Sequence, residues 1–151
     1  MERTWLPLSV QKFHKYEMEQ NYKEVAEALG IYNLGNKYPS EISGGQQQRT
    51  AAARAFVHKP TIIFADEPTG ALDSKSAQDL LHRLEDMNKQ FNSTIMMVTH
   101  DPSAASYAER VIMLKDGDIH SEIYQGNDSK QTFYQEIMKL QTALGGVSHD
   151  I

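Results

Sequence analysis

Two short apolar runs, Thr61–Ala65 and Thr94–Val98, constrain the fold of this chain more than any other feature. Each joins β-branched, aliphatic or aromatic residues without a polar alternation, which is typical of a strand buried on both faces of a parallel sheet. Between them lies a helical stretch that begins at an expected cap, Ser74, and runs to about Phe91. The order strand, helix, strand predicts an α/β fold with a parallel sheet.

Turn and cap signals divide the rest of the chain. Gly30 predicts the end of a helix that begins near Gln11, and Ser43 predicts the N-cap of the next helix. Lys115–Asp118 predicts a hairpin turn with Asp-Gly at its centre. The other expected elements are a loop at Asn33–Ser40, a helix at Gln46–Val57 closed by Pro60, a short helix at Ser103–Tyr107, hairpin strands at Arg110–Leu114 and Ile119–Tyr124, and an amphipathic helix at Ser129–Leu144.

Ionisable residues follow both predicted parallel strands. Asp66 and Glu67 come directly after the first, and His100 follows the second by one residue. Chemistry in α/β folds takes place at the carboxyl ends of the strands, so we expect these three side chains to share one rim. One acid suits Mg²⁺, the next suits an attacking water, and a neutral histidine suits a terminal phosphate. The alternative without a functional role is that the two acids are solvated in a turn and the histidine is a packed or solvated side chain.

A glycine pair stands at the start of the helix that Ser43 caps. In Ile42–Arg49, Gly44 and Gly45 let backbone N–H groups approach an anion, and the helix N-terminus adds positive potential. The alternative is an ordinary serine-capped helix. Ala71–Asp73, taken alone, is a loop that leads to the next helix.

The composition excludes several classes of protein. The 151 residues carry a net charge of -5, which argues against a non-specific nucleic-acid binder because such a protein needs a basic face. There is no cysteine, which suits a reducing cytosol. The longest apolar runs are too short to span a bilayer, and no signal peptide is evident. Any membrane role is therefore expected to come through a partner.

Four segments in this order resemble the ATP-binding-cassette (ABC) ATPase family. Ile42–Gln46 is similar to its signature motif, with Ile42 in place of the usual leucine. Phe64–Thr69 resembles the Walker B strand with its catalytic glutamate. Ala71–Asp73 resembles the D-loop, and Thr99–Asp101 resembles the segment that holds the switch histidine.

The resemblance implies a site for ATP and Mg²⁺ that two head-to-tail subunits share. Asp66 would hold Mg²⁺, Glu67 would polarise the attacking water, and His100 would bind the γ-phosphate. The residues implied to contact ATP held by the second subunit, or to link the two sites, are Ser43, Gly44, Gly45, Gln46 and Asp73.

Finer features resemble particular branches of that family. Ser43–Arg49 and Ala65–Ser74 are similar to the lipoprotein-release and macrolide-efflux type, and the tail from Phe133 to Gly146 resembles the bacitracin-efflux ATPases. No Gly-x-x-x-x-Gly-Lys-Ser/Thr occurs in the sequence, although that P-loop normally cradles the phosphates. The chain is therefore expected to be the C-terminal part of an ABC ATPase and inactive alone.

The expected architecture is a partial P-loop NTPase fold of class α/β. Residues 1–56 form a helical subdomain that ends in the signature helix, 57–124 form the C-terminal half of the ATPase core, and 125–151 form a C-terminal helix and tail. Removal of the P-loop strand is expected to leave an apolar edge or face of the sheet exposed.

The function implied is that of an ATP-hydrolysing subunit of a transporter for antimicrobial peptides or lipoprotein-like substrates. The implied partners are a second ATPase subunit and an integral membrane permease, with no nucleic acid, and the implied location is the cytoplasmic face of the cell membrane. One alternative is a non-catalytic module that docks on a permease or an intact ATPase. Another is a soluble ABC ATPase of DNA repair or translation.

Overall fold

The computed structural model describes residues 15–145, which form two compact units that divide between Val98 and Thr99. The divisions expected from the family resemblance, after residues 56 and 124, concern subdomains of an ABC ATPase and stay predictions. Within residues 15–145, no helix is both long enough and apolar enough to cross a membrane.

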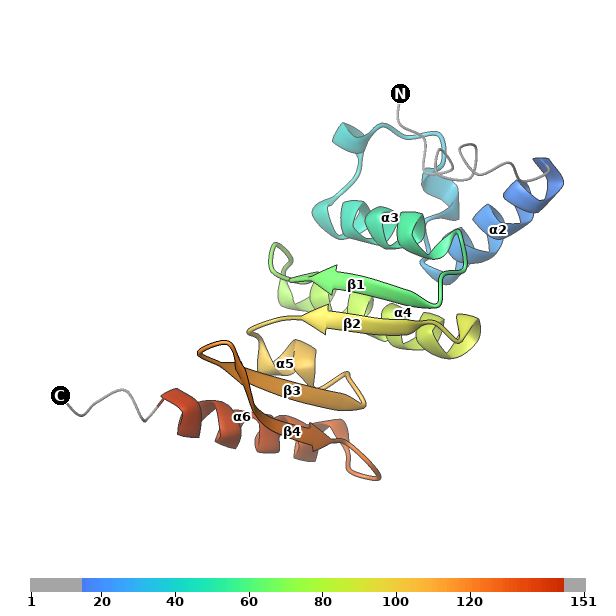
Figure 1. Cartoon of the computed structure of the whole chain (residues 1–151). Helices are drawn as coiled ribbons and strands as arrows, with labels where there is room; N and C mark the ends of the chain where they lie inside the picture. The colour runs from blue at the N-terminus through green and yellow to red at the C-terminus, as the bar shows by residue number, and fades with distance from the viewer. Residues whose placement is uncertain (1–14, 146–151) are drawn as a thin grey trace. The chain divides into compact units, whose positions relative to one another are not determined.

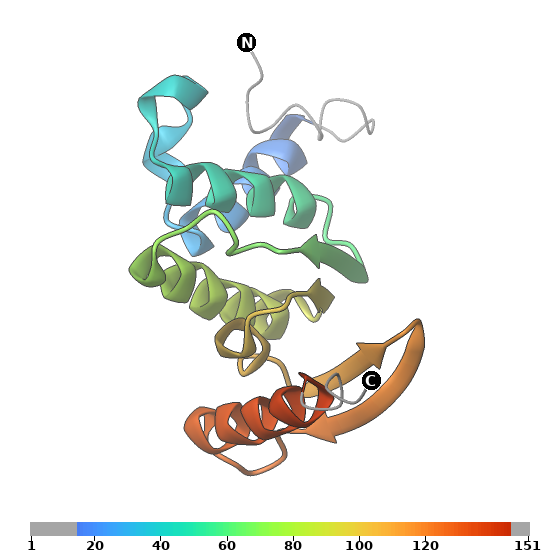
Figure 2. The same ribbon diagram turned by 90° about the vertical axis from the view of Figure 1, so that its left-hand side faces the viewer.

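The first unit alternates helices with two strands (Figure 1). β1 and β2 lie side by side, and α4 lies next to the pair both in this view and in the turned view of Figure 2. The elements are α2 (Lys15–Ala28), the 3-10 turns η1 (Tyr32–Leu34) and η2 (Pro39–Glu41), α3 (Gly44–Phe56), β1 (Ile62–Asp66), α4 (Ser74–Phe91) and β2 (Thr94–Val98). The segment expected to be a loop at 33–40 thus contains most of two 3-10 turns.

The two strands pair in parallel, which confirms the predicted order of strand, helix and strand. Ile62 pairs with Thr94, and the register continues to Asp66 opposite Val98. Burial on both faces was expected, and this is wrong for the part of the chain that the structure describes. Ile63 is buried on one face, whereas its neighbour Phe64 is 73% exposed on the other. The difference arises because the core that this unit forms reaches only one face of the pair.

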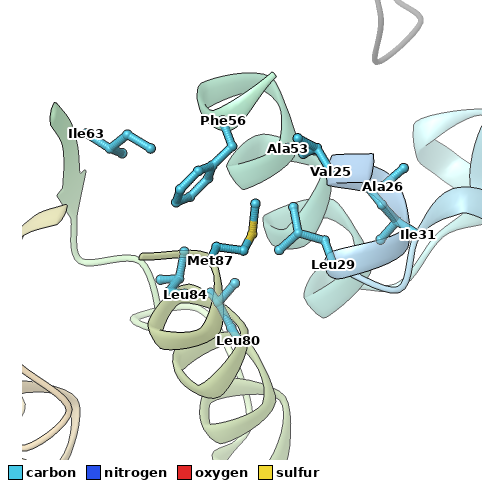
Figure 3. Close-up of a cluster of buried hydrophobic side chains, with 10 residues drawn as sticks. All are labelled: Val25, Ala26, Leu29, Ile31, Ala53, Phe56, Ile63, Leu80, Leu84 and Met87. Atoms are coloured by element: carbon cyan, nitrogen blue, oxygen red, sulfur yellow. The ribbon is translucent and has the colours of Figure 1, made fainter. Parts of the chain in front are cut away.

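The buried face belongs to a core built by three helices and β1. Figure 3 shows Phe56 of α3 and Met87 of α4 close to each other within the cluster. Both are fully buried, and each is long enough to contact several helices. The cluster consists of Val25, Ala26, Leu29, Ile31, Ala53, Phe56, Ile63, Leu80, Leu84 and Met87. This single core fixes α2, α3 and α4 relative to one another.

The opposite face of the β1–β2 pair carries exposed apolar side chains. Besides Phe64, they are Ile62, Met96 and Val98, with exposures of 46%, 51% and 57%. Because paired residues of a parallel sheet point to the same side, these four side chains form one patch, which we call the outer sheet face. A patch of this kind marks an interface or an aggregation liability. The structure thus agrees with the expectation of an exposed apolar face.

Replacing Phe64 by threonine is expected to reduce aggregation of the chain while changing the free energy of unfolding little. Threonine keeps the preference for a strand, and the lost side chain is largely in water already. Sedimentation and the fluorescence of a hydrophobic dye measure the change. Ile63→Thr is the matched control, because it places a hydroxyl in the core and is expected to unfold the chain. Equal behaviour of the two variants would contradict the assignment of the two faces.

Gly30 ends α2, as the sequence predicts. Its φ is +65°, and the amides of Gly30 and Ile31 donate to the carbonyls of Glu27 and Ala26 at 3.0 and 2.8 Å. These two bonds define a Schellman cap, which needs a residue in the left-handed conformation. A Cβ at Gly30 would also lie 3.0 Å from Nη1 of Arg83.

Gly30→Ala is expected to lower the free energy of unfolding by about 1–2 kcal/mol, because alanine is strained at positive φ. The new methyl group would also press on the Arg83 guanidinium. Gly126→Ala is the matched control, since Gly126 has φ +56° and open space around its Cα. Urea unfolding of both variants separates strain from crowding, and a smaller loss at Gly30 than at Gly126 would contradict this account.

The cap of α4 differs from the expected one. Asp73, not Ser74, is the N-cap, and its carboxylate accepts hydrogen bonds from the amides of Lys75 and Ser76 at 3.1 and 3.0 Å. Ser74 is already the first helical residue. Asp73 occupies the N-cap position because its carboxylate accepts hydrogen bonds from two amides. Its negative charge also lies at the positive end of the helix dipole.

The second unit is a hairpin with helices α5 (Pro102–Ala105), shorter than expected, and α6 (Lys130–Gly145). β3 (Arg110–Lys115) and β4 (Asp118–Tyr124) pair antiparallel around Asp116 and Gly117, both at positive φ. This geometry is that of a type I′ turn, as the Asp-Gly pair predicts. The expected stripe of α6 is partly confirmed: Phe133 and Ile137 are buried, and Leu140 and Leu144 are half-buried.

Candidate functional site

The first turn of α3 is closed by a reciprocal pair of hydrogen bonds. Ser43 Oγ accepts from the amide of Gln46 at 3.3 Å, and Gln46 Oε1 accepts from the amide of Ser43 at 2.9 Å. Ser43 and Gly44 are exposed, whereas Gly45 is buried. This capping box confirms Ser43 as the N-cap and presents the helix N-terminus to solvent. The turn suits an anion brought by a second molecule.

Gly45 is buried because the first turn of α4 lies against it. A Cβ at Gly45 would stand 3.2 Å from the side chain of Ser76, and one at Gly44 would be 4.0 Å from Leu72. The glycine pair therefore permits close packing as well as the approach of an anion. The structure brings together the two predicted motifs that begin α3 and α4.

Asp66 and Glu67 stand at the end of β1, where the chain turns sharply. Asp66 is exposed and lies on the same side of the strand as Phe64, two residues earlier. Glu67 has φ +42°, and its amide donates to the carbonyl of Val98 at 2.9 Å. The left-handed residue redirects the chain directly after Asp66, so the backbone that carries Glu67 no longer follows the strand.

Asp66 can serve as a Mg²⁺ ligand only together with groups from elsewhere. Among residues 15–145, no group of three or more His, Cys, Asp or Glu side chains is arranged to hold a metal. A single exposed carboxylate nevertheless fits Mg²⁺, which keeps several waters and binds substrate phosphates alongside one or two protein ligands. The geometry suits an ion that arrives with a nucleotide.

Asp73 is the N-cap of α4, whose first turn lies against the start of α3. Its carboxylate also accepts from the hydroxyl of Ser76 at 2.7 Å, and this hydrogen bond is the largest of the causes that lower its pKa. The backbone amides of Ser76 and Lys75 act in the same direction. Asp73 therefore stays ionised at neutral pH at the N-terminus of α4.

His100 belongs to the second unit, so its place on one rim with Asp66 and Glu67 stays a prediction. Its carbonyl accepts from Gln141 Nε2 of α6 at 3.2 Å. Next to it, Asp101 caps α5 by accepting from the amide of Ser103 at 2.8 Å. The loop that carries His100 is thus held by two helices of its own unit.

Two residues that were not predicted from the sequence, Gln141 and Asp79, contact segments that carry predicted site residues. Gln141 follows the buried Ile137 by one helical turn, a spacing that could have pointed to it. Asp79 of α4 binds Arg49 of α3, and its signal was the arginine in the segment after the glycine pair. Neither residue stands out by type, because glutamine and aspartate are common on exposed helix faces.

Comparison with known proteins gives the same family at the levels of sequence and fold. The family model of the ABC transporter domain matches residues 2–70. The bacitracin export ATP-binding protein BceA of Halalkalibacterium halodurans is 57% identical over 149 residues, which cover 99% of this chain and 59% of BceA. The macrolide export ATP-binding/permease protein MacB of Psychrobacter cryohalolentis is 55% identical over 101 residues, 64% of this chain and 15% of MacB.

Solved structures agree in fold. A dimeric post-hydrolysis state of the ATP-binding cassette MJ0796, bound to ADP and Pi, has a TM-score of 0.66 at 37% identity, with 80% of this chain and 54% of that chain covered. The structure of cbiO1 from Clostridium perfringens, part of the ABC transporter complex cbiONQ, has a TM-score of 0.78 at 25% identity, with 97% and 58% covered. The chain thus spans little more than half the length of BceA and of these two solved chains, and a much smaller part of MacB. By sequence and by fold it belongs to the ATP-binding proteins of the ABC transporter family.

Proposed function

We propose that this chain is the signature- and Walker B-bearing part of an ATP-hydrolysing subunit that powers export or removal of antimicrobial peptides. The observation that carries the proposal is the 57% identity with the bacitracin export ATP-binding protein over 99% of the chain. The matched region includes all four motifs, from Ile42 to Asp101. Lipoprotein-like substrates are the second substrate class proposed, and they rest on the resemblance of Ser43–Arg49 and Ala65–Ser74 to the lipoprotein-release type.

The chemistry proposed for the strand end is in-line attack of water on the γ-phosphorus of ATP. Glu67 accepts the proton as the oxygen–phosphorus bond forms, and the bond to the leaving ADP breaks. Asp66 would hold Mg²⁺, and the bound ion would supply positive charge next to the phosphate oxygens. His100 donates a hydrogen bond to the γ-phosphate. The exposed carboxylate of Asp66 and the redirected backbone at Glu67 support this division of roles.

The signature turn is proposed to act on ATP held by a second subunit. Ser43, Gly44, Gly45 and Gln46 then contact its phosphates from the N-terminus of α3, and Asp73 links the two sites. Exposure of Ser43 and Gly44 supports a contact across an interface. A dimeric relative bound to ADP and Pi supports the same arrangement.

The proposed partners are a second ATP-binding subunit and an integral membrane permease. MacB is named as a macrolide export ATP-binding/permease protein, and cbiO1 is part of an ABC transporter complex. Both support a permease partner. Through such a permease the subunit is proposed to lie on the cytoplasmic face of the membrane. A nucleic-acid partner is not proposed, because the chain is acidic overall.

A second candidate function is a non-catalytic module that docks on a permease or on an intact ATPase. The outer sheet face favours it, because four exposed apolar side chains suit a protein partner. The acids at Asp66 and Glu67 favour the catalytic proposal, since docking has no use for them.

Equilibrium binding of Mg-ATP tests the proposal. The 151-residue chain is compared with the same chain joined to the P-loop-bearing segment of BceA that it does not match. Binding by the extended form alone is the expected result. Micromolar binding by the 151-residue chain would show a different phosphate site and overturn the assignment of the motifs. Failure of both forms to bind, when both are folded, would favour the docking module.

A further inference from the structure

Asp79 joins three helices of the first unit through two arginines. Its carboxylate forms an ion pair with Nη1 of Arg49 from α3 and accepts from Nε of Arg83, with 3.2 Å to each oxygen. Arg83 Nη1 in turn donates to the carbonyl of Ala28 at the end of α2, at 2.9 Å. One carboxylate on α4 is therefore connected to α3 directly and to α2 through Arg83.

The ion pair lies at matching positions along α3 and α4. Arg49 follows its N-cap Ser43 by six residues, and Asp79 follows its N-cap Asp73 by six. Six residues correspond to a rise of about 9 Å along a helix. The pair thus ties the two helices at the same distance from their N-termini.

A second contact ties the same helices at their first turns. Gly45 approaches the side chain of Ser76 so closely that a Cβ would stand 3.2 Å away, and Ser76 donates to Asp73. The two contacts lie about one helical turn apart, so together they resist sliding or rotation of one helix against the other. The Arg49 side chain is only 17% exposed, so it has little freedom to choose another partner.

The carboxylate of Asp79 stays ionised at neutral pH. Partial burial of Asp79 raises its pKa, but the hydrogen bonds and charges of Arg83 and Arg49 outweigh that effect and hold the pKa below its usual value. The Arg49 Nε is buried without a hydrogen-bond partner among the described residues, so loss of Asp79 would leave a poorly solvated guanidinium. Such a loss would move α3 away from α4.

We propose that Asp79 is a positioning residue that fixes the start of α3 against the start of α4 through Arg49, and so holds the signature turn and Asp73 in one geometry. This inference rests on the proposed function, in which both turns meet a nucleotide shared with a second subunit. Asp79 itself touches no nucleotide in this scheme. Its effect is expected at Gly44 and Gly45, about one helical turn before Arg49 on α3.

Backbone amide NMR spectra of the 15N-labelled chain give the first test. Asp79→Asn is expected to move the signals of Gly44, Gly45 and Ser76, and Asp79→Glu is expected to restore them. Asp86→Asn is the matched control, because it makes the same change at an exposed position of the same helix. Shifts confined to the neighbours of Asp79 would overturn the proposal.

Arg49→Lys keeps the charge but removes the forked geometry of the guanidinium, so it carries the same test if Asp79→Asn does not fold. It is expected to shift the same three amides by a smaller amount. A folded Arg49→Lys chain with unchanged signals at Gly44 and Gly45 would also overturn the proposal.

The extended form that carries a P-loop separates this inference from the proposed function. Asp79→Asn is expected to leave Mg-ATP binding unchanged and to weaken ATP-driven dimerisation by about tenfold, within the range of couplings between contacting residues. Loss of binding by the unmodified extended form would refute the proposed function. Intact binding with unaltered dimerisation of the variant would refute the positioning role alone.

Discussion

Replacing Glu67 by glutamine in the complete protein is expected to lower ATP turnover by about 100- to 10,000-fold, the usual contribution of a general base. The amide keeps the size of the side chain and its place after the left-handed turn at φ +42°. It cannot accept the proton of the attacking water. ATP then stays intact between the two subunits, and the ATP-bound dimer becomes the stable species.

Phosphate release and size-exclusion chromatography in Mg-ATP measure the two parts of this result. Glu136→Gln is the matched control, because it makes the same chemical change on an exposed face of α6. The control is expected to turn over ATP at the unmodified rate and to return to monomers. Normal turnover by Glu67→Gln would remove Glu67 as the base, whatever the dimer does.

Replacing Phe56 by alanine is expected to lower the free energy of unfolding by about 3–5 kcal/mol. Its ring is fully buried at the end of α3 and lies 6.0 Å from the ring of Phe91, centroid to centroid. The cavity would open where α3, α4 and β1 meet, as Figure 3 shows. A loss of this size approaches the whole stability of a small domain.

Chemical denaturation followed by circular dichroism measures this loss, either in the 151-residue chain or in its extended form. Tyr16→Ala provides the control, since this aromatic side chain is 72% exposed and is expected to change the stability by less than about 0.5 kcal/mol. Similar midpoints for the two variants would show that the core is not organised around Phe56.

Local patterns predicted much of the fold because the contacts that decide them are close in sequence. The capping box at Ser43 spans four residues, and the hairpin turn at Asp116 and Gly117 depends on two. The acids after β1 and the parallel pairing could also be read from order and spacing. The order and spacing of the four motifs together predicted the ABC ATPase family, and the comparisons confirm this prediction.

Features that depend on distant residues were missed or wrong. Asp79 is thirty residues from Arg49 in sequence, and no local pattern joins them. The apolar runs alone predicted strands buried on both faces, and this is wrong for the described residues, because burial depends on which elements lie over each face. The N-cap of α4 was predicted at Ser74 but lies at Asp73. Aspartate and serine are both common N-cap residues, so the sequence alone could not choose between these two neighbours. His100 lies in a different unit from Glu67, so spacing could not fix their distance.

The backbone at Glu67 also bears on how this domain could be redesigned. A glutamate in the left-handed conformation costs about 1 kcal/mol relative to glycine, and asparagine tolerates that conformation better as well. A search that optimises folding alone would therefore place glycine or asparagine after Asp66. Under the proposed mechanism such a variant would lose its general base, so stability and the proposed activity are opposed at this residue. A more stable variant of this domain that is meant to keep the proposed activity should therefore leave Glu67 unchanged.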